Sequence, residues 1–171
     1  VAGDGTAGSA DGTGAAARFQ DPLGIALAPN GDLIVGDTMN HALRRVTPAG
    51  VVTTLAGNGT AGFADGPGMG TARLNAPAGV VVAADGTIYF SEYYGHRIRK
   101  LDPAGVVSTV AGGTGGVDPG RDFADGTGAA ARFATPLGLV LLPGGDLLVA
   151  DRYNNRLRRV TPAGVVTTFA G

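Results

Sequence analysis

Two histidines occupy matching places in the sequence and are the first candidates for chemistry. His41 and His96 each follow an acidic residue by four positions, Asp37 and Glu92 respectively. Neutral imidazole is a common ligand of zinc. The sequence offers no constellation of carboxylates facing this pair, so we expect structural histidines and no metal site.

Tyrosine and arginine gather just after the same kind of acidic position. Tyr93 and Tyr94 follow Glu92, and Arg152 and Tyr153 follow Asp151. These residue types often anchor binding interfaces when they are exposed, and loops on a rigid scaffold often carry function. We therefore predict a loop face that binds a ligand, with the candidate residues Asn40, His41, Tyr93, Tyr94, His96, Arg152, Tyr153 and Asn154.

The acidic residues and the asparagines of these segments also have a structural explanation. A carboxylate at a strand end can accept backbone N–H groups across a turn, and asparagine tolerates the left-handed conformation there. Both interpretations stay open for Asn40 and Asn154.

Residues suited to catalysis are scarce. The chain has no cysteine, and Ser91 stands beside Glu92 without the nucleophile-elbow motif of an acyl-transfer enzyme. A glycine-rich segment at Gly57 has dinucleotide-loop spacing, but the required helix and second parallel strand do not follow it. We expect no enzyme, no catalytic residue and no cofactor.

Asp-Gly pairs recur at Asp11, Asp65 and Asp125. They lack the alternating acidic residues of a calcium-binding loop. We expect each aspartate to cap a turn through its own backbone.

Three copies of one sequence unit position these residues. The anchors Pro22, Pro77 and Pro136 recur at similar intervals, and the extra residues of the longer second interval fall in a segment rich in Gly, Pro and Asp at 112–122. The chain is therefore expected to form a single repeat domain, 1–171, with units at about 1–54, 55–109 and 110–171.

Each unit predicts four short strands in an antiparallel meander. An apolar run (23–28, 78–83, 137–142) is expected to be buried on both faces, and a two-residue Gly-containing turn of the primed type joins it to a second strand (32–37, 87–92, 146–151). A third strand (42–47, 97–102, 156–161) and a Pro-Ala-Gly turn lead to a fourth (51–57, 106–112, 165–171). Beyond a turn or two near the GAAARF segments, we expect essentially no helix.

The arginines of the third strand recur with the repeat. We expect their stems to pack between units with the charged heads at the rim. They are Arg44, Arg45, Arg99, Arg158 and Arg159.

Such four-stranded units, repeated along a chain, are typical of β-propeller blades. The run from the anchoring proline through the acidic residue to an Asn-His pair resembles the NHL repeat, with Asn40-His41, Gly95-His96 and Asn154-Asn155 at the pair. The departures are Gly95, Asn155 and Ala42. The resemblance implies the propeller fold; because the family includes RNA binders, protein binders and a peptide-amidating lyase, it does not specify the function.

Three blades are fewer than the four to eight or so that close a propeller. We therefore predict an all-β protein that closes as a six-bladed ring in a homodimer, through contacts between blade 1 of one copy and blade 3 of the other. The near-identity of the first and third units, and a start at Val1 without a leader sequence, suggest an excised or engineered fragment.

Composition limits the partners. The net charge is −1 with 44% hydrophobic residues, which predicts a soluble protein and argues against nucleic-acid and membrane partners. We expect a noncatalytic scaffold whose loop face binds protein, peptide or glycan. Two alternatives stay open: a metal-dependent propeller enzyme of the amidating-lyase or lactonase type, and a single-stranded RNA binder. The cellular compartment is not indicated.

Overall fold

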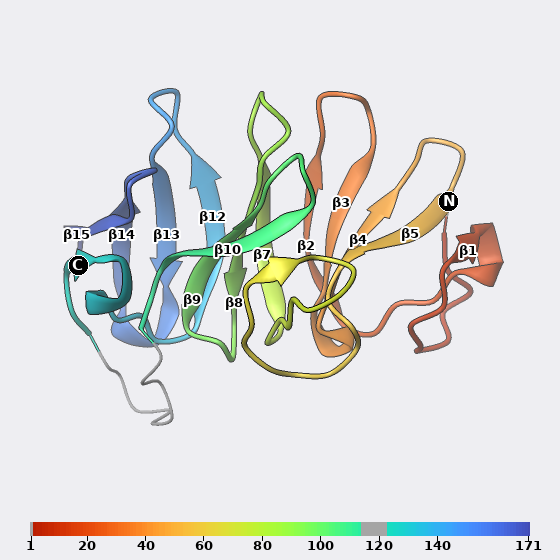
Figure 1. Cartoon of the computed structure of the whole chain (residues 1–171), viewed down its shortest axis with the longest axis horizontal. Helices are drawn as coiled ribbons and strands as arrows, with labels where there is room; N and C mark the ends of the chain where they lie inside the picture. The colour runs from red at the N-terminus through yellow and green to blue at the C-terminus, as the bar shows by residue number, and fades with distance from the viewer. Residues whose placement is uncertain (1, 114–122) are drawn as a thin grey trace.

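Three antiparallel sheets stand side by side in chain order (Figure 1) in a computed structural model that describes residues 2–113 and 123–171. Most of the segment in which we expect the extra residues of the third unit, 112–122, lies outside these ranges. The first sheet has the order β1-β5-β4-β3-β2. Its strands are β1 (Gly12–Thr13), β2 (Pro22–Leu27), β3 (Leu33–Asp37), β4 (Ala42–Val46) and β5 (Val51–Ala56).

The other two sheets repeat this order. The second contains β6 (Gly66–Pro67), β7 (Pro77–Val82), β8 (Ile88–Glu92), β9 (Arg97–Leu101) and β10 (Val106–Ala111). The third contains β11 (Gly126–Thr127), β12 (Pro136–Leu141), β13 (Leu147–Asp151), β14 (Arg156–Val160) and β15 (Val165–Ala170).

The predicted meander of four strands is confirmed in every unit, and a fifth strand joins it. β1, β6 and β11 each have two residues and pair antiparallel with the outer strand of their own sheet, as in the pairing of Gly12 with Val52. Successive inner strands lie beside one another, β2 next to β7 and β7 next to β12. The three sheets therefore pack face to face with their inner strands on one side.

The hairpin after each inner strand differs from the two-residue turn that we predicted. Gly31 donates its N–H to the Ala28 carbonyl at 2.9 Å, and Ala28 pairs with Asp32 across the loop at 2.8 Å. The loop thus has three residues, with Gly31 at φ +87° in the left-handed region. A primed turn needs a positive φ at its first central residue as well, and Asn30 does not adopt one.

Helical structure within the described residues is limited to four short 3₁₀ turns. Two of them fall in the GAAARF segments, as predicted, and two follow the second strand of the first and third units. They are η1 (Gly14–Ala16), η2 (Thr38–Asn40), η3 (Gly128–Ala130) and η4 (Arg152–Asn154). None of the helical segments in these ranges has the length and apolar character needed to cross a bilayer.

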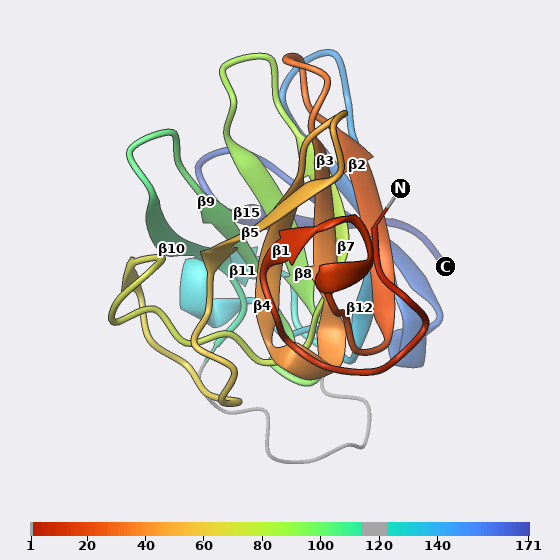
Figure 2. The ribbon, with the colours of Figure 1, turned by 90° about the vertical axis from the view of Figure 1, so that its right-hand side faces the viewer.

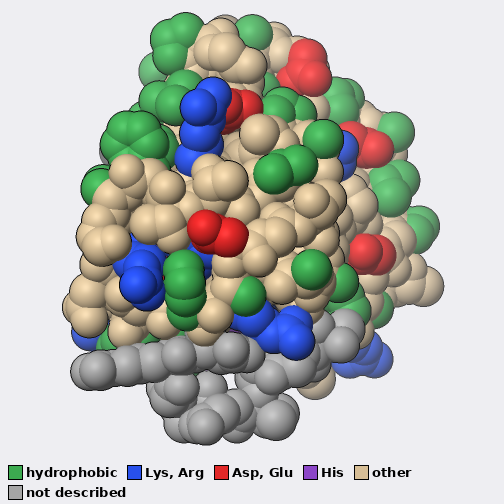
Figure 3. Space-filling view, turned by 90° about the vertical axis from the view of Figure 1, so that its left-hand side faces the viewer, with side chains coloured by type: hydrophobic (Ala, Val, Ile, Leu, Met, Phe, Trp, Pro, Cys, Tyr) green, Lys and Arg blue, Asp and Glu red, His purple; other side chains and the backbone are tan. Residues whose placement is uncertain are grey.

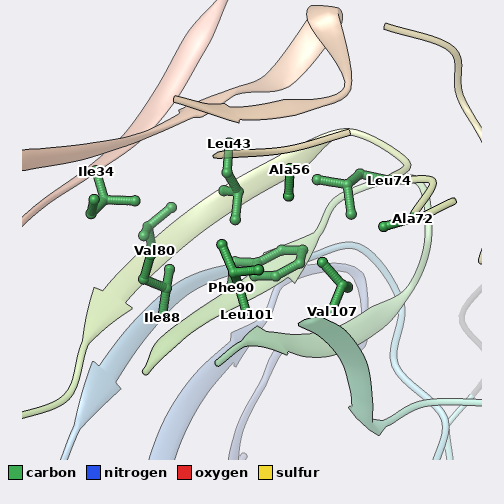
Figure 4. Packing of buried hydrophobic residues seen from close by; sticks show 10 residues of the cluster. All are labelled: Ile34, Leu43, Ala56, Ala72, Leu74, Val80, Ile88, Phe90, Leu101 and Val107. Atoms are coloured by element: carbon green, nitrogen blue, oxygen red, sulfur yellow. The ribbon is translucent and has the colours of Figure 1, made fainter. Parts of the chain in front are cut away.

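The core lies between the sheets. Figure 4 shows the cluster between the first and second sheets, where Leu43 and Ala56 of one sheet meet Leu74, Phe90 and other side chains of the next. A second cluster joins the second and third sheets through equivalent positions, including Ile98, Ala111, Phe133, Leu139 and Val149. Burial between neighbouring sheets is the main favourable contribution to the packing of the units.

The two end sheets each present an apolar face to the outside. On the first sheet, whose side faces the viewer in Figure 2, Leu23, Ile25 and Leu27 of β2 are exposed. The prediction that the inner strand is buried on both faces is therefore wrong for β2 and, at Val140, for β12, because each of these strands packs against a neighbouring inner strand, β7, on one side only. On the third sheet, seen from its side in Figure 3, the exposed hydrophobic residues include Val140, Leu157 and Phe169.

Candidate functional site

The predicted loop residues lie in the connections from the second to the third strand of each sheet. These connections are at the sheet end opposite the hairpins that follow β2, β7 and β12. Each ends on a residue in the left-handed region, namely His41 at φ +50°, His96 at φ +54° and Asn155 at φ +52°. The chain reverses at this residue, so the preceding side chains project from the same end of the molecule.

Four of the predicted residues form a cluster that spans the second and third sheets. The Arg152 guanidinium donates a hydrogen bond to the Tyr93 hydroxyl at 3.0 Å and lies 4.9 Å from the centre of the Tyr153 ring. Tyr94 packs edge-on against Tyr93, with ring centres 4.6 Å apart. Tyr94 is 53% exposed and Tyr153 is 40% exposed. We call these four residues the loop-face cluster.

The two asparagines of the predicted set lie beneath the surface. Asn40 donates to the Asp37 carboxylate at 2.8 Å and to the Gly8 carbonyl at 2.7 Å. Asn154 donates to the Asp151 carboxylate at 2.8 Å. Both side chains are buried, and these contacts hold the loops against the ends of β3 and β13.

The arginines of the third strands are divided between two environments. Arg44, Arg99 and Arg158 are fully buried together with their charged heads, so the expectation that these heads lie at the rim is wrong. Arg45 and Arg159 are substantially exposed and pair with Asp32 and Asp146. The difference follows from strand alternation, because adjacent residues point to opposite faces of a sheet.

Each buried guanidinium is held by a carboxylate from the neighbouring strand and by backbone carbonyls. Arg44 pairs with Asp37 at 2.7 Å and with the Arg18 and Ala10 carbonyls at 3.1 and 2.9 Å. The equivalent pairs are Arg99 with Glu92 at 2.7 Å and Arg158 with Asp151 at 2.8 Å. The recurrence of an acidic residue and an arginine seven positions apart in every unit is the sequence signal from which these pairs could have been found.

The aspartates of the Asp-Gly pairs complete the same sites. Asp11 accepts from Arg44 at 2.8 Å and from the Thr54 N–H at 3.1 Å, and Asp65 and Asp125 do the same in their own sheets. These carboxylates therefore bind arginine and the outer strand, and the expectation that they cap turns through their own backbone needs correction. These aspartates bind arginine because the buried guanidinium has several N–H donors and needs a second carboxylate acceptor beside the one on the neighbouring strand.

The histidines join neighbouring sheets. His41 Nδ1 accepts the Ala76 N–H at 3.0 Å, and His96 Nδ1 accepts the Thr135 N–H at 2.9 Å. Each ring is therefore neutral, with its proton on Nε2. Burial lowers the pKa of both imidazoles, and the nearby Arg97 lowers the pKa of His96 further against an opposing effect of Asp151. Within the described ranges, no three His, Asp or Glu side chains gather as a metal site.

Ser91 has a comparable role between the second and third sheets. Its hydroxyl donates to the Leu137 carbonyl at 2.6 Å and accepts the Gly79 N–H at 2.9 Å. Both hydrogen bonds are made to inner strands, so this serine connects strands.

The second unit carries an altered version of the buried pair. Glu92 replaces the aspartate, and Gly95 stands where Asn40 and Asn154 stand in the other units. The Oε2 atom of Glu92 is buried without a hydrogen-bond partner, and burial raises the pKa of this carboxyl despite the adjacent Arg99. A Cβ at Gly95 would overlap Glu92 Oε2. The longer acid therefore occupies the space of the missing asparagine.

Comparison with known proteins agrees with this architecture. The model of the NHL repeat matches residues 19–45 and 133–159. Protein SUPPRESSOR OF QUENCHING 1, chloroplastic, of Arabidopsis thaliana is 38% identical over 96 residues, which are 56% of this chain and 9% of that protein. NHL repeat-containing protein 2 of Bos taurus is 35% identical over 98 residues, which are 56% of this chain and 14% of that protein.

A solved structure, described as a putative phosphatase from Bacteroides thetaiotaomicron, superposes with a TM-score of 0.67 at 26% identity, over 85% of this chain and 35% of that one. Three four-stranded meanders with adjacent inner strands define the chain as part of a β-propeller. It spans a small part of the length of its curated relatives. The predicted resemblance to the NHL repeat is confirmed by the matches at 19–45 and 133–159 and by the similarity to NHL repeat-containing protein 2.

The altered pair in the second unit predicts strong coupling between positions 92 and 95. Gly95→Asn alone should lower the free energy of unfolding by about 1–3 kcal/mol, because the new side chain overlaps the Glu92 carboxylate. The double variant Glu92→Asp, Gly95→Asn should recover most of this loss by recreating the arrangement of Asp37 and Asn40. Urea unfolding of the wild type, both single variants and the double variant measures the coupling, and additive effects would contradict the argument.

The neutral histidines predict a dependence of stability on pH. The pKa values of both imidazoles are lowered in the folded protein, whereas in the unfolded chain they return to the usual value of about 6.5. Below this pH the unfolded state therefore binds more protons than the folded state, and the free energy of unfolding decreases. The stabilisation is fully present above that pH and is lost as the pH falls through the folded-state pKa values. Urea unfolding between pH 5 and pH 8 should show this decrease.

The double variant His41→Asn, His96→Asn is the matched control, because Asn155 already occupies the equivalent left-handed position. Its stability should vary less over this pH range. An unchanged slope in the variant would show that other groups cause the dependence.

Proposed function

We propose that this chain is a noncatalytic NHL-repeat scaffold that completes a six-bladed propeller by pairing with a second copy, and that its loop face binds a protein, peptide or glycan. The observation that carries the assembly is the exposure of residues at the two ends whose repeat equivalents are buried. Leu43 and Ile98 are fully buried, whereas Leu157, at the same position of the third sheet, is 43% exposed.

The opposite end shows the same contrast. Val80 and Leu139 are buried against the preceding sheet, whereas Ile25, their equivalent in the first sheet, is 63% exposed. It lines a hollow with Phe19 and Val35, among other apolar residues. Large apolar patches on soluble proteins commonly mark interaction surfaces, and here the two ends have the same residue pattern as the two faces that already meet inside the chain.

Closure follows from the number of blades. Propellers have about four to eight blades, and two copies of three give six. The contact joins unlike ends, and its occurrence twice about a two-fold axis closes the ring, so that no free face remains.

The assembly predicts a solution mass twice the chain mass of 16.9 kDa. Light scattering over a dilution series should give this dimer mass down to micromolar concentration. A monomeric mass throughout would contradict the proposal, and a mass that grows with concentration would show that the contact propagates without closing.

The loop-face cluster supports the binding role. Tyr94 and Tyr153 present aromatic surface at the end of the sheets, while Arg152 is oriented by Tyr93 and offers further guanidinium N–H groups. Tyrosine and arginine anchor peptide and protein ligands, and tyrosine rings also offer an apolar surface to sugar rings. In the dimer this cluster would occur twice on one face.

Binding is tested by screening peptide and glycan arrays with labelled wild-type protein. Tyr94→Ala and Tyr153→Ala should each weaken a ligand found in this way by about tenfold or more, as is typical for an interface anchor. Met69→Ala, at an exposed residue outside the loop face, is the matched control and should leave affinity unchanged. A ligand whose affinity is insensitive to both tyrosine changes would not bind at this face, and arrays without any ligand would count against the binding role.

A further inference from the structure

A recurring joint connects each sheet to the next, and one part of it is a glycine on the inner strand. A Cβ on Gly24 would overlap the Ala78 carbonyl oxygen, and a Cβ on Gly79 would overlap the Leu137 carbonyl oxygen. Neither glycine has a positive φ, so close approach of the next inner strand is the reason for glycine here.

The second part of the joint is a hydrogen bond from the next sheet. The Nδ1 atoms of His41 and His96 accept the N–H groups of Ala76 and Thr135, as described above. Both donor residues adopt a left-handed conformation, with φ of +56° and +57°. The glycine therefore sets the distance between neighbouring inner strands, and the imidazole hydrogen bond sets the position of one sheet along the next.

Each end sheet carries one half of this joint with no partner sheet packed against that half in the described residues. The third sheet has the glycine and the acceptor position, and the first sheet has the donor and the carbonyl. On the third sheet, Gly138 is the repeat equivalent of Gly24 and Gly79, and a Cβ there would have nothing within 4 Å. Asn155 occupies the histidine position at φ +52° and is exposed. On the first sheet, Asp21 has the left-handed φ of +51° seen at Ala76 and Thr135, and Leu23 is the equivalent of Ala78 and Leu137.

We propose that Asn155 of one copy accepts a hydrogen bond from the Asp21 backbone N–H of a second copy, while Gly138 seats against the Leu23 carbonyl. This inference rests on the proposed dimer and specifies its register. The occupant is a second copy because this chain itself presents both halves of the joint, at opposite ends. The side-chain oxygen of asparagine accepts an N–H as the imidazole Nδ1 does, and asparagine tolerates the required left-handed backbone.

The joint predicts that Asn155→Gly weakens the dimer and that Asn155→His preserves it. Glycine adopts the same φ but removes the acceptor, and the hydrogen bond is lost at both joints of the ring, so the dimer dissociation constant should rise roughly tenfold or more. Histidine restores the acceptor found at His41 and His96. Analytical ultracentrifugation at pH 8 measures the dissociation constants.

Gly138→Asn tests the second contact, with Gly144→Asn as the matched control. Both glycines have open space around a Cβ and no positive φ, and side chains already stand at Asn30 and Asp85, the equivalents of Gly144. Gly138→Asn should raise the dimer dissociation constant at least a hundredfold, and Gly144→Asn should leave it unchanged. Circular dichroism melts of diluted, monomeric samples should be similar for both variants.

The outcomes distinguish a failure of the proposed dimer from a failure of the proposed joint. A wild-type chain that stays monomeric would overturn the second copy as the occupant, and with it the proposed dimer. A wild-type dimer whose dissociation constant is unaffected by Asn155→Gly and Gly138→Asn would leave the dimer standing and overturn the joint.

Discussion

The buried ion pair between a third-strand arginine and a second-strand carboxylate is the interaction on which each blade depends. A fully buried guanidinium is tolerated when its charge is paired and its N–H groups are hydrogen bonded. Arg44 pairs its charge and bonds both terminal nitrogens through acceptors from the end of β3, from the segment before β2 and from Asp11 beside β1. Its Nε is buried and has no hydrogen-bond partner among the described residues. One side chain therefore fixes the relative positions of segments that contribute little apolar packing of their own.

The same ion pair prepares the loop face above it. The Asp37 carboxylate that holds Arg44 also accepts the Gln20 N–H at 2.8 Å and the Asn40 amide, so the turn after β3 and the approach to β2 share one acceptor. Asp151 does the same for Ala134 and Asn154. Arg152 and Tyr153 stand on a turn whose backbone is fixed by these contacts, which lowers the entropy that a ligand must remove on binding.

The sequence predicted the strands well and the polar interior poorly, for physical reasons that differ. Runs such as 51–57 alternate or cluster apolar residues and end at Gly or Pro, so their extent follows from local chemistry. β1 has two residues, too few for any periodicity, and its pairing with β5 is fixed by Asp11 reaching Arg44 and Thr54. Whether an arginine head is buried depends on acceptors that are distant in the sequence, such as the Arg18 carbonyl that holds Arg44, and strand patterns do not reveal them.

The loop-face cluster was anticipated by residue type, whereas its internal contacts depend on the packing of neighbouring sheets.

Equivalent residues of the three units differ in burial, and the difference depends on whether their sheet packs against a neighbouring sheet on that side. Leu43, Ile98 and Leu157 occupy equivalent positions of the three units. The first two are buried between neighbouring sheets, whereas Leu157 belongs to neither inter-sheet cluster and is exposed. The inner-strand glycines show the same contrast. Gly24 and Gly79 allow the next inner strand to approach closely, whereas the equivalent Gly138 has open space around it in the single chain. A repeat whose end surfaces had diverged to face water would carry polar groups at these positions, as the terminal repeats of solenoid proteins do. Both end sheets keep the interior apolar pattern, and this pattern is the physical basis of the proposed pairing with a second copy.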